Sequence, residues 1–354
     1  MEYRQLGRSG LIVSVLTMGT MTFGGRGHHA NAGSTGLDEA RRQIDMCLDA
    51  GVNLIDTSNT YSSGLSEEIL GEALAGGRRG RVLLATKGRG RMGDGVNERG
   101  LSRHYLIEQC ENSLRRLRTD HIDLYQLHFW DGTTPLEETV RALDDLQRSG
   151  KVRYVGVSNF SGWHLMKLIG VAGREGAPPI VSHQIHYTLQ AREAEYELVP
   201  IAIDQGVGLL VWSPLAGGLL TGKYRRDGTG PDGARHMGAW SEPPIRDRDA
   251  LFDLIEVLTE VARAEGCTPA QLALAYLLRR PGVVSLVIGA RTAAQLADNL
   301  AAVALNPSAA AFARLDAASA PPLIYPYWHQ ARTIGDRLGA ADRSLLEPHL
   351  PQRA

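Results

Sequence analysis

Three of the chain's short apolar runs end in side chains of complementary chemistry, at Asp56, Lys87 and His128. Tyr61 follows Asp56 by five residues. Reduction of a carbonyl group needs a hydride on carbon and a proton on oxygen, so a proton donor must stand beside the hydride source. Tyrosine can serve if its pKa, ordinarily about 10, is lowered. A lysine ammonium nearby would lower that pKa, and a carboxylate would hold the ammonium in place.

These roles predict Tyr61 as the general acid, with Lys87 and Asp56 adjusting its pKa. His128 would orient the substrate oxygen by a hydrogen bond. Taken singly, such residues have ordinary explanations, because an aspartate often caps a helix and a lysine or tyrosine at a rim is usually solvated. Four of them on one rim favour a functional interpretation. A competing hypothesis makes Lys87 the nucleophile of a Schiff-base lyase.

The elements that would position these side chains alternate regularly. Short apolar runs predict buried parallel strands, and amphipathic stretches such as 37–51 and 136–150 predict helices between them. Gly51 and Gly150 end these two helices, since glycine accepts the left-handed conformation there. No GxGxxG follows the first run, which disfavours a dinucleotide-binding open sheet. The eight runs are VLTMG, VNLID, VLLATK, IDLYQLH, VRYVGVSN, IVSHQIHY, VGLLVWS and VSLVIG.

This alternation predicts an α/β fold, a single (β/α)8 TIM barrel domain over residues 1–354, with a core of about 3–320 and a C-terminal tail of 321–354. Two long insertions, 24–36 and 221–249, follow strands and therefore belong at the rim where barrel active sites are built. The run GRGRMGDG after the third strand predicts a flexible loop. The aromatic tail is expected to cover one edge of the barrel mouth.

Composition excludes several classes of partner. Lys and Arg total 38 against 39 Asp and Glu, so the net charge of -1 offers no attraction to nucleic acid or to an anionic membrane. The three cysteines lie far apart, which disfavours a disulfide framework or a zinc site, and His28 and His29 have no further ligand spacing for a metal. No apolar stretch approaches the length of a membrane span, which is about 20 residues, and no signal peptide is evident, so a cytoplasmic location is expected. The sequence leaves a monomer and a homo-oligomer equally open.

Ordered motifs resemble the aldo-keto reductase superfamily from about Tyr3 to Trp328. They are GVNLIDTSNTYSSGLSEEILGEAL, LLATK, DLYQLH, GKVRYVGVSNF, WSPLAGG and VIGARTAAQLADN. The resemblance implies NADPH-dependent reduction of an aldehyde or ketone, with a catalytic tetrad that falls on the four residues above. The chain is closer to the potassium-channel beta-subunit branch than to the aldose reductase branch. Because that branch serves channels by binding cofactor, a regulatory subunit with slow turnover is the alternative function.

The resemblance also implies the cofactor site. Ser158, Asn159 and Gln184 would bind the nicotinamide carboxamide, and Trp212 would stack on the ring. Backbone N–H groups near glycines can approach a pyrophosphate. The full expected set is Gly19, Thr20, Met21, Asp56, Ser158, Asn159, Gln184, Trp212, Ser213, Pro214, Leu215, Gly217, Gly218, Lys223, Gly289, Arg291, Thr292, Gln295, Asp298 and Asn299.

The preference for NADPH over NADH rests mainly on Arg291, which with Thr292 would receive the 2′-phosphate, because arginine binds phosphate through two parallel hydrogen bonds. Gln295, Asp298 and Asn299 would lie along the adenosine. Here the chain departs from the better-known branch, which carries a Lys-Ser pair in this loop and a later arginine where Gln295 stands.

An apolar and aromatic mouth is expected to bind the carbonyl substrate. It suits aromatic aldehydes, quinones or bulky ketones, and keto-sugars remain possible because aromatic faces also bind sugars. The expected substrate contacts are Phe23, Tyr61, His128, Trp130, His186 and Trp240, with Met21, Tyr325 and Trp328 as further candidates.

Overall fold

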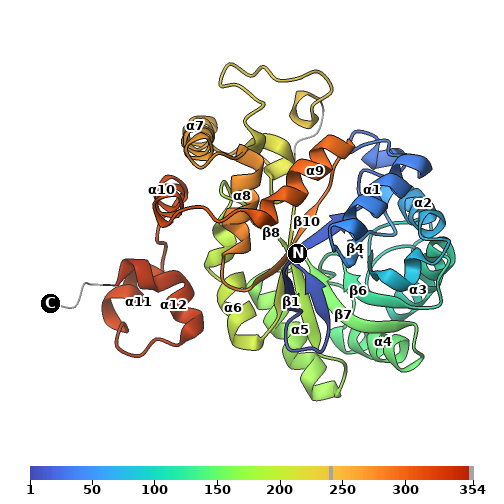
Figure 1. Ribbon diagram of the computed structural model, residues 1–354. Coiled ribbons are helices and arrows are strands. Elements are labelled where there is room, and N and C mark those ends of the chain that lie inside the picture. Colours follow the sequence, from blue (N-terminus) through green and yellow to red (C-terminus); the bar gives the residue numbers. More distant parts are fainter. Residues whose placement is uncertain (239–241, 351–354) are drawn as a thin grey trace.

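A computed structural model describes residues 1–238 and 242–350. Its centre is a closed barrel of eight parallel strands in the order β10-β3-β4-β5-β6-β7-β8-β9, so the predicted (β/α)8 barrel is confirmed (Figure 1). Every predicted apolar run overlaps one of these strands. The strands are β3 (Leu16–Gly19), β4 (Leu54–Asp56), β5 (Leu83–Gly88), β6 (Ile122–Leu127), β7 (Val152–Ser158), β8 (Ile180–His186), β9 (Gly208–Trp212) and β10 (Val283–Ile288).

A short antiparallel hairpin closes the amino-terminal end of the barrel. It consists of β1 (Tyr3–Gln5) and β2 (Ile12–Ser14), and in Figure 1 the N-terminus lies over the barrel centre. Leu6 is fully buried against the apolar side chains that fill this end. Gly7 lets the hairpin approach so closely, since a Cβ there would lie 2.3 Å from the carbonyl oxygen of Val181. The closed bottom leaves the opposite end of the barrel as the place for a site.

The helices surround the barrel and continue into the tail. The predicted helix ends are confirmed at Gly51 and Gly150, whose φ angles of 83° and 75° are left-handed. The α-helices are α1 (Leu37–Asp49), α2 (Leu65–Ala73), α3 (Arg103–Leu117), α4 (Leu136–Arg148), α5 (Gly162–Glu175), α6 (Leu198–Gln205), α7 (Arg248–Ala264), α8 (Pro269–Leu278), α9 (Ala293–Ala301), α10 (Ala309–Ser319), α11 (Tyr327–Thr333) and α12 (Ala340–Leu346). Short 3-10 turns are Gly27–His29, Tyr61–Gly64, Arg78–Arg81, Glu193–Glu195, Ala216–Thr221, Arg235–Met237, Ala302–Ala304 and Glu347–His349.

The C-terminal tail lies beside the barrel, which corrects the expectation that it covers the mouth. In Figure 1, α11 and α12 lie next to α6 at the side of the molecule. Tyr327 stacks on Tyr196 with ring centroids 5.5 Å apart and donates a hydrogen bond to Glu197. Leu345 and Leu346 are buried in a small apolar cluster that belongs to the tail. These contacts hold the tail against the side of the barrel. Tyr325 and Trp328 are exposed.

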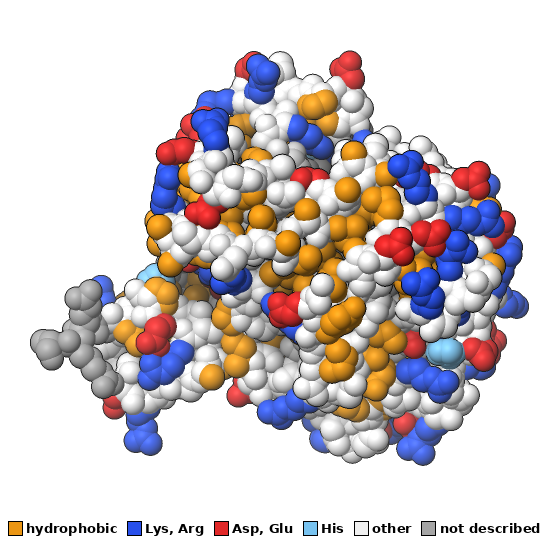
Figure 2. All heavy atoms as spheres, in the orientation of Figure 1, with side chains coloured by type: hydrophobic (Ala, Val, Ile, Leu, Met, Phe, Trp, Pro, Cys, Tyr) orange, Lys and Arg blue, Asp and Glu red, His pale blue; other side chains and the backbone are white. Residues whose placement is uncertain are grey.

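Charged side chains of both signs are interspersed around the face shown in Figure 2, in keeping with the balanced composition. Within residues 1–238 and 242–350, no helix is long and apolar enough to span a membrane, and no group of His, Cys, Asp and Glu could hold a metal ion.

Candidate active site

The four predicted catalytic residues meet at the carboxyl ends of three adjacent strands. Nζ of Lys87 lies 2.5 Å from Oδ2 of Asp56, 3.0 Å from the carbonyl oxygen of Thr57 and 3.1 Å from the hydroxyl of Tyr61. The rings of Tyr61 and His128 meet edge to face, with centroids 6.0 Å apart. The ammonium therefore links the carboxylate to the phenol, as the residue types predicted.

Two amide side chains fix Asp56 on its other oxygen. Nε2 of Gln126 and Nε2 of Gln184 donate to Oδ1 at 3.0 Å and 2.9 Å. The sequence interpretation missed Gln126. Its signal was its position two residues before His128, because alternate residues of a strand point to the same side. The buried carboxylate of Asp56 is therefore held in place by three hydrogen-bond donors, Lys87, Gln126 and Gln184.

The direction of the Tyr61 pKa corrects the sequence expectation. Burial raises the pKa of the Tyr61 phenol above its usual value, and the charge of Lys87 opposes this rise without reversing it. Burial alone would lower the pKa of Lys87, but Asp56 and Tyr61 outweigh burial and raise it. The phenol therefore keeps its proton at neutral pH, and the ammonium keeps its charge.

These contacts leave Lys87 poorly suited to Schiff-base chemistry. A Schiff-base lysine must present a neutral, accessible amine to a carbonyl carbon. The side chain of Lys87 is completely buried, and its three N–H donors each have an acceptor. The geometry thus disfavours the lyase hypothesis.

His128 is oriented by a hydroxyl behind it. Oγ of Ser58 lies 3.1 Å from Nδ1 of His128, which leaves Nε2 for the cavity. Burial and neighbouring cations, Lys87 first among them, hold the pKa of His128 well below its usual value. A neutral imidazole with one N–H can donate a hydrogen bond to an oxygen without adding a charge.

A cavity of about 1300 Å³ opens from the tetrad toward α9. Trp212 borders it, and Nε1 of Trp212 donates to Oδ1 of Asn159 at 2.9 Å. Asn159 in turn donates to Oγ of Ser158 and to the carbonyl oxygen of His128. The predicted residues that line this cavity are Gly19, Thr20, Met21, Asp56, Tyr61, His128, Ser158, Asn159, Gln184, Trp212, Ser213, Pro214, Leu215, Gly217, Gly218, Lys223, Gly289, Arg291, Gln295, Asp298 and Asn299.

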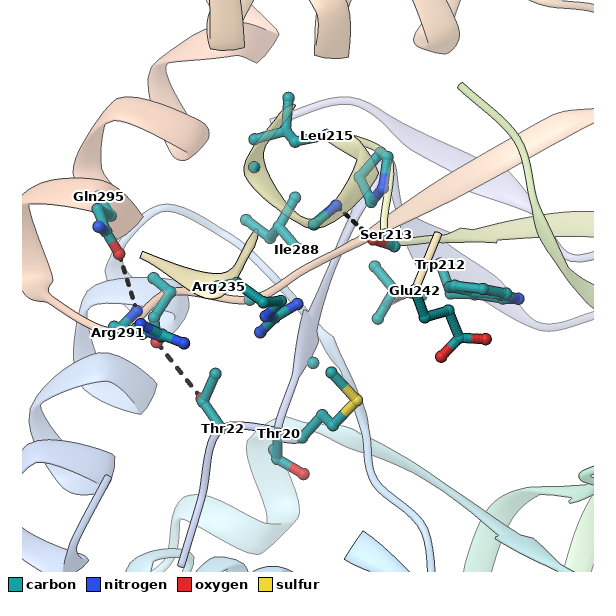
Figure 3. A pocket seen from close by; sticks show the side chains of 18 of the residues that line it. Thr20, Thr22, Trp212, Ser213, Leu215, Arg235, Glu242, Ile288, Arg291 and Gln295 are labelled. Carbon is teal, nitrogen blue, oxygen red and sulfur yellow. Dashed lines mark hydrogen bonds between the residues drawn. The ribbon is translucent and has the colours of Figure 1, made fainter. Parts of the chain in front are cut away.

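Three cations converge on the far end of the cavity. Arg235, which the sequence interpretation missed, points into it beside Arg291 (Figure 3). Burial, then the charges of Arg291 and Arg235, lower the pKa of Lys223. Burial and Arg291 likewise lower the pKa of Arg235. Three cations gathered at one end of a cavity make this end attractive to an anion.

Arg291 also joins the two insertions over the cavity. Its guanidinium donates to the carbonyl oxygens of Asn31 at 2.9 Å, Ala32 at 3.3 Å and Gly233 at 2.5 Å. Arg235 donates to the same oxygen of Ala32 at 3.2 Å. Both insertions therefore lie at the rim, as predicted, and both are anchored by arginines that face the cavity.

The start of α9 differs in one residue from the expectation. Thr292 does not line the cavity; its hydroxyl caps α9 by accepting a hydrogen bond from the backbone N–H of Gln295. Gln295 does line it, and its Oε1 accepts from the backbone N–H of Arg291 (Figure 3). Capping a helix is the ordinary use of a threonine at this position.

Of the expected substrate contacts, Met21, Tyr61 and His128 line the cavity, whereas Phe23, Trp130 and His186 do not. Phe23 is completely buried in the core, and Trp130 stacks on His164 with centroids 4.0 Å apart, away from the cavity. His186 packs against Trp212 and is also absent from the lining. Trp240 lies outside the described residues. These aromatic side chains satisfy packing between elements, which sequence periodicity does not distinguish from lining a pocket.

Phe129, which stacks on His128, and three polar residues take their place around the tetrad. His29, Arg91 and Glu242 line the cavity, and the rings of His29 and Tyr61 lie 5.3 Å apart. His29 and Glu242 come from the two insertions, and Arg91 comes from the loop predicted to be flexible. Loops carry no periodic signal, so the sequence placed the two insertions at the rim but could not show which of their side chains line the cavity.

Comparison with known proteins assigns the family. The model of the Aldo/keto reductase family matches residues 15–320. The chain belongs to the aldo/keto reductase family. This result confirms the resemblance found in the sequence.

Three relatives cover most of this member of the aldo/keto reductase family. An uncharacterized oxidoreductase, YrpG of Bacillus subtilis (strain 168), is 40% identical over 316 residues, which are 86% of this chain and 92% of YrpG. A probable voltage-gated potassium channel subunit beta of Arabidopsis thaliana is 35% identical over 315 residues, 87% and 92% of the two chains. Protein tas of Escherichia coli (strain K12) is 34% identical over 346 residues, 90% and 97%. The chain is therefore an oxidoreductase of this family, with relatives in the predicted branch.

Proposed function

We propose that this chain is an NADPH-dependent reductase of aldehydes or ketones, with Tyr61 as the general acid. The observation that supports it most directly is the buried ammonium of Lys87, which bonds both Asp56 and Tyr61 beside the cavity. When the phenol gives up its proton, a charged lysine beside it stabilises the phenolate that remains.

When bound, the cofactor supplies a hydride to the carbonyl carbon. The hydroxyl of Tyr61 gives its proton to the carbonyl oxygen, and Lys87 stabilises the phenolate that remains. Asp56 holds Lys87 charged, with Gln126 and Gln184 behind it. His128 donates a hydrogen bond to the same oxygen and so fixes the orientation of the substrate.

The cavity fits a dinucleotide with phosphate groups. Gly217 and Gly218 have left-handed φ angles of 65° and 97°, and a Cβ at Gly218 would lie 2.9 Å from Nζ of Lys223. Their backbone can therefore approach a pyrophosphate without a side chain between them. Ser158, Asn159, Gln184 and Trp212 would hold the nicotinamide end. Lys223, Arg235 and Arg291 favour an additional 2′-phosphate, and hence NADPH over NADH.

The cofactor preference is tested by replacing Arg235 and Arg291 singly with alanine. Loss of a charged hydrogen bond to phosphate should weaken NADPH binding by about tenfold or more and leave NADH binding nearly unchanged. Fluorescence titration gives both dissociation constants, and Arg225→Ala, on the same insertion but outside the cavity lining, is the matched control. Equal affinities of the wild type for the two cofactors, unaltered in both variants, would contradict the assignment.

The second candidate function is a cofactor-binding regulatory subunit with slow turnover. The relative named as a potassium channel subunit beta supports it. The complete tetrad favours multiple turnovers. Stopped-flow mixing with excess carbonyl compound separates the two functions, since a regulatory subunit would oxidise one equivalent of cofactor and retain the product.

A further inference from the structure

The loop of residues 88–95, which follows β5, is fixed beside the tetrad by close approach and hydrogen bonds. A Cβ at Gly90 would lie 2.3 Å from Cγ2 of Thr60, the residue before Tyr61. The hydroxyl of Tyr105 also donates to the carbonyl oxygen of Gly90. The sequence predicted a flexible loop, whereas these contacts hold its first half against the segment that carries Tyr61.

This placement brings Arg91 to the cavity. Its Nε donates to the carbonyl oxygen of Gly93 at 2.7 Å and its Nη2 to that of Asp94 at 3.1 Å, so the loop orients the guanidinium. The carboxylate of Asp94 lies 3.8 Å away and is fully exposed. Such a solvated pair neutralises little of the arginine charge.

A second arginine strengthens the positive potential on this side. Arg89 has a φ of 146°, a strained conformation for a residue with a side chain. Within the described residues its Nε is buried and has no hydrogen-bond partner. Its charge reaches His128. Backbone strain and a buried Nε without a hydrogen-bond partner are costs that a binding role for this loop would explain.

The other charges around the tetrad do not cancel these arginines. Lys87 is already paired with Asp56. Glu242 lies beside Trp212 (Figure 3), and its charge acts on both Arg235 and Tyr61. His29, next to Tyr61, is the other titratable group from an insertion here. The wall formed by His29, Arg91 and His128 therefore carries no acid that lines the cavity.

We propose that the preferred substrates are aldehydes or ketones that carry a carboxylate or phosphate group, and that Arg91 binds this group. The inference rests on the proposed reductase function. The carbonyl oxygen lies against Tyr61 and His128, and the anionic group extends along the wall to Arg91. A guanidinium held in a fixed orientation suits both anions.

Two matched pairs of compounds test this assignment in the NADPH oxidation assay. Para-formylbenzoate is compared with its methyl ester, and glyceraldehyde phosphate with glyceraldehyde. In at least one pair, the wild type should prefer the anion by about tenfold in kcat/KM, the size expected for a charged hydrogen bond. Arg91→Ala should remove most of that ratio, and Arg91→Lys should restore part of it. An effect confined to one pair identifies the anion that Arg91 binds.

Arg99→Ala is the control, because this substitution removes the same charge from a nearby segment. Arg99 is exposed and does not line the cavity. It should leave both ratios unchanged. A kcat/KM ratio near one for both pairs in the wild type, or ratios that Arg91→Ala does not alter, would overturn the inference. In that case, reduction of the neutral compounds would still support the reductase function. Absence of NADPH oxidation with all four compounds would instead overturn the reductase function itself.

Discussion

At the scale of single residues, burial sets the direction of the pKa shift at Tyr61 and His128, whereas neighbouring charges outweigh burial at Lys87. Asp56, Tyr61, Lys87 and His128 could be predicted because each lies at, or shortly after, the carboxyl end of a strand that the apolar runs indicate. The direction of the Tyr61 pKa could not, because it depends on how deeply the phenol is buried. Gln126 was missed because an amide has no characteristic motif, although it holds the carboxylate of Asp56.

His183 shows the same effect of burial and gives a stability prediction. It is fully buried on β8, its Nε2 accepts a hydrogen bond from the backbone N–H of Phe160, and burial lowers its pKa to about 3. Below pH 6.5, the usual pKa of histidine, His183 binds a proton in the unfolded chain but stays neutral in the folded chain. The stability from the neutral ring is therefore complete above 6.5 and falls as the pH drops toward 3.

Urea unfolding at two pH values measures this contribution. Between pH 7 and pH 5 the free energy of unfolding should fall by about 2 kcal/mol more in the wild type than in His183→Gln, whose amide oxygen can accept the same bond. His104→Gln, at an exposed position on α3, should behave as the wild type does. Parallel pH dependences of His183→Gln and the wild type would contradict the assignment.

At the scale of elements, regular strands and helices could be predicted, but the segments between them could not. Periodicity marks β3 to β10 and helices such as α1 and α4. Periodicity does not indicate where an irregular segment folds. The positions of Arg235 and Arg91 in the cavity therefore could not be predicted. The predicted position of the tail was wrong for a related reason. Its aromatic residues indicate that the tail packs on another surface, but they do not indicate which one.

A variant that ends at Ala320 tests the observed place of the tail. The tail packs on α6 and its described residues do not line the cavity. NADPH affinity and kcat for a neutral aldehyde should therefore stay within about twofold of the wild type, since distant sites behave independently. The melting temperature should fall by a few degrees because α6 loses apolar cover. Loss of turnover in a variant that remains folded and binds NADPH would show that the tail does reach the site.

At the scale of the whole molecule, one cavity joins two regions that each carry positively charged side chains. The cations near α9 suit the phosphates of a cofactor, while the tetrad and Arg91 lie at the other end. The barrel supplies the rigid rim, and the two insertions, tied by Arg291, complete the walls. The family could be predicted from ordered motifs, whereas the charge pattern of the cavity required the fold.

The most direct test of the proposed function is carbonyl-dependent oxidation of NADPH by the wild type and by Tyr61→Phe, with alcohol formation measured in parallel. The wild type should complete many turnovers with one alcohol formed per NADPH. Tyr61→Phe should lose about a hundredfold or more in kcat, because it lacks the proton donor, and should bind NADPH as tightly. Near-normal turnover by Tyr61→Phe would contradict the general-acid role, and a single turnover by the wild type would contradict the reductase function.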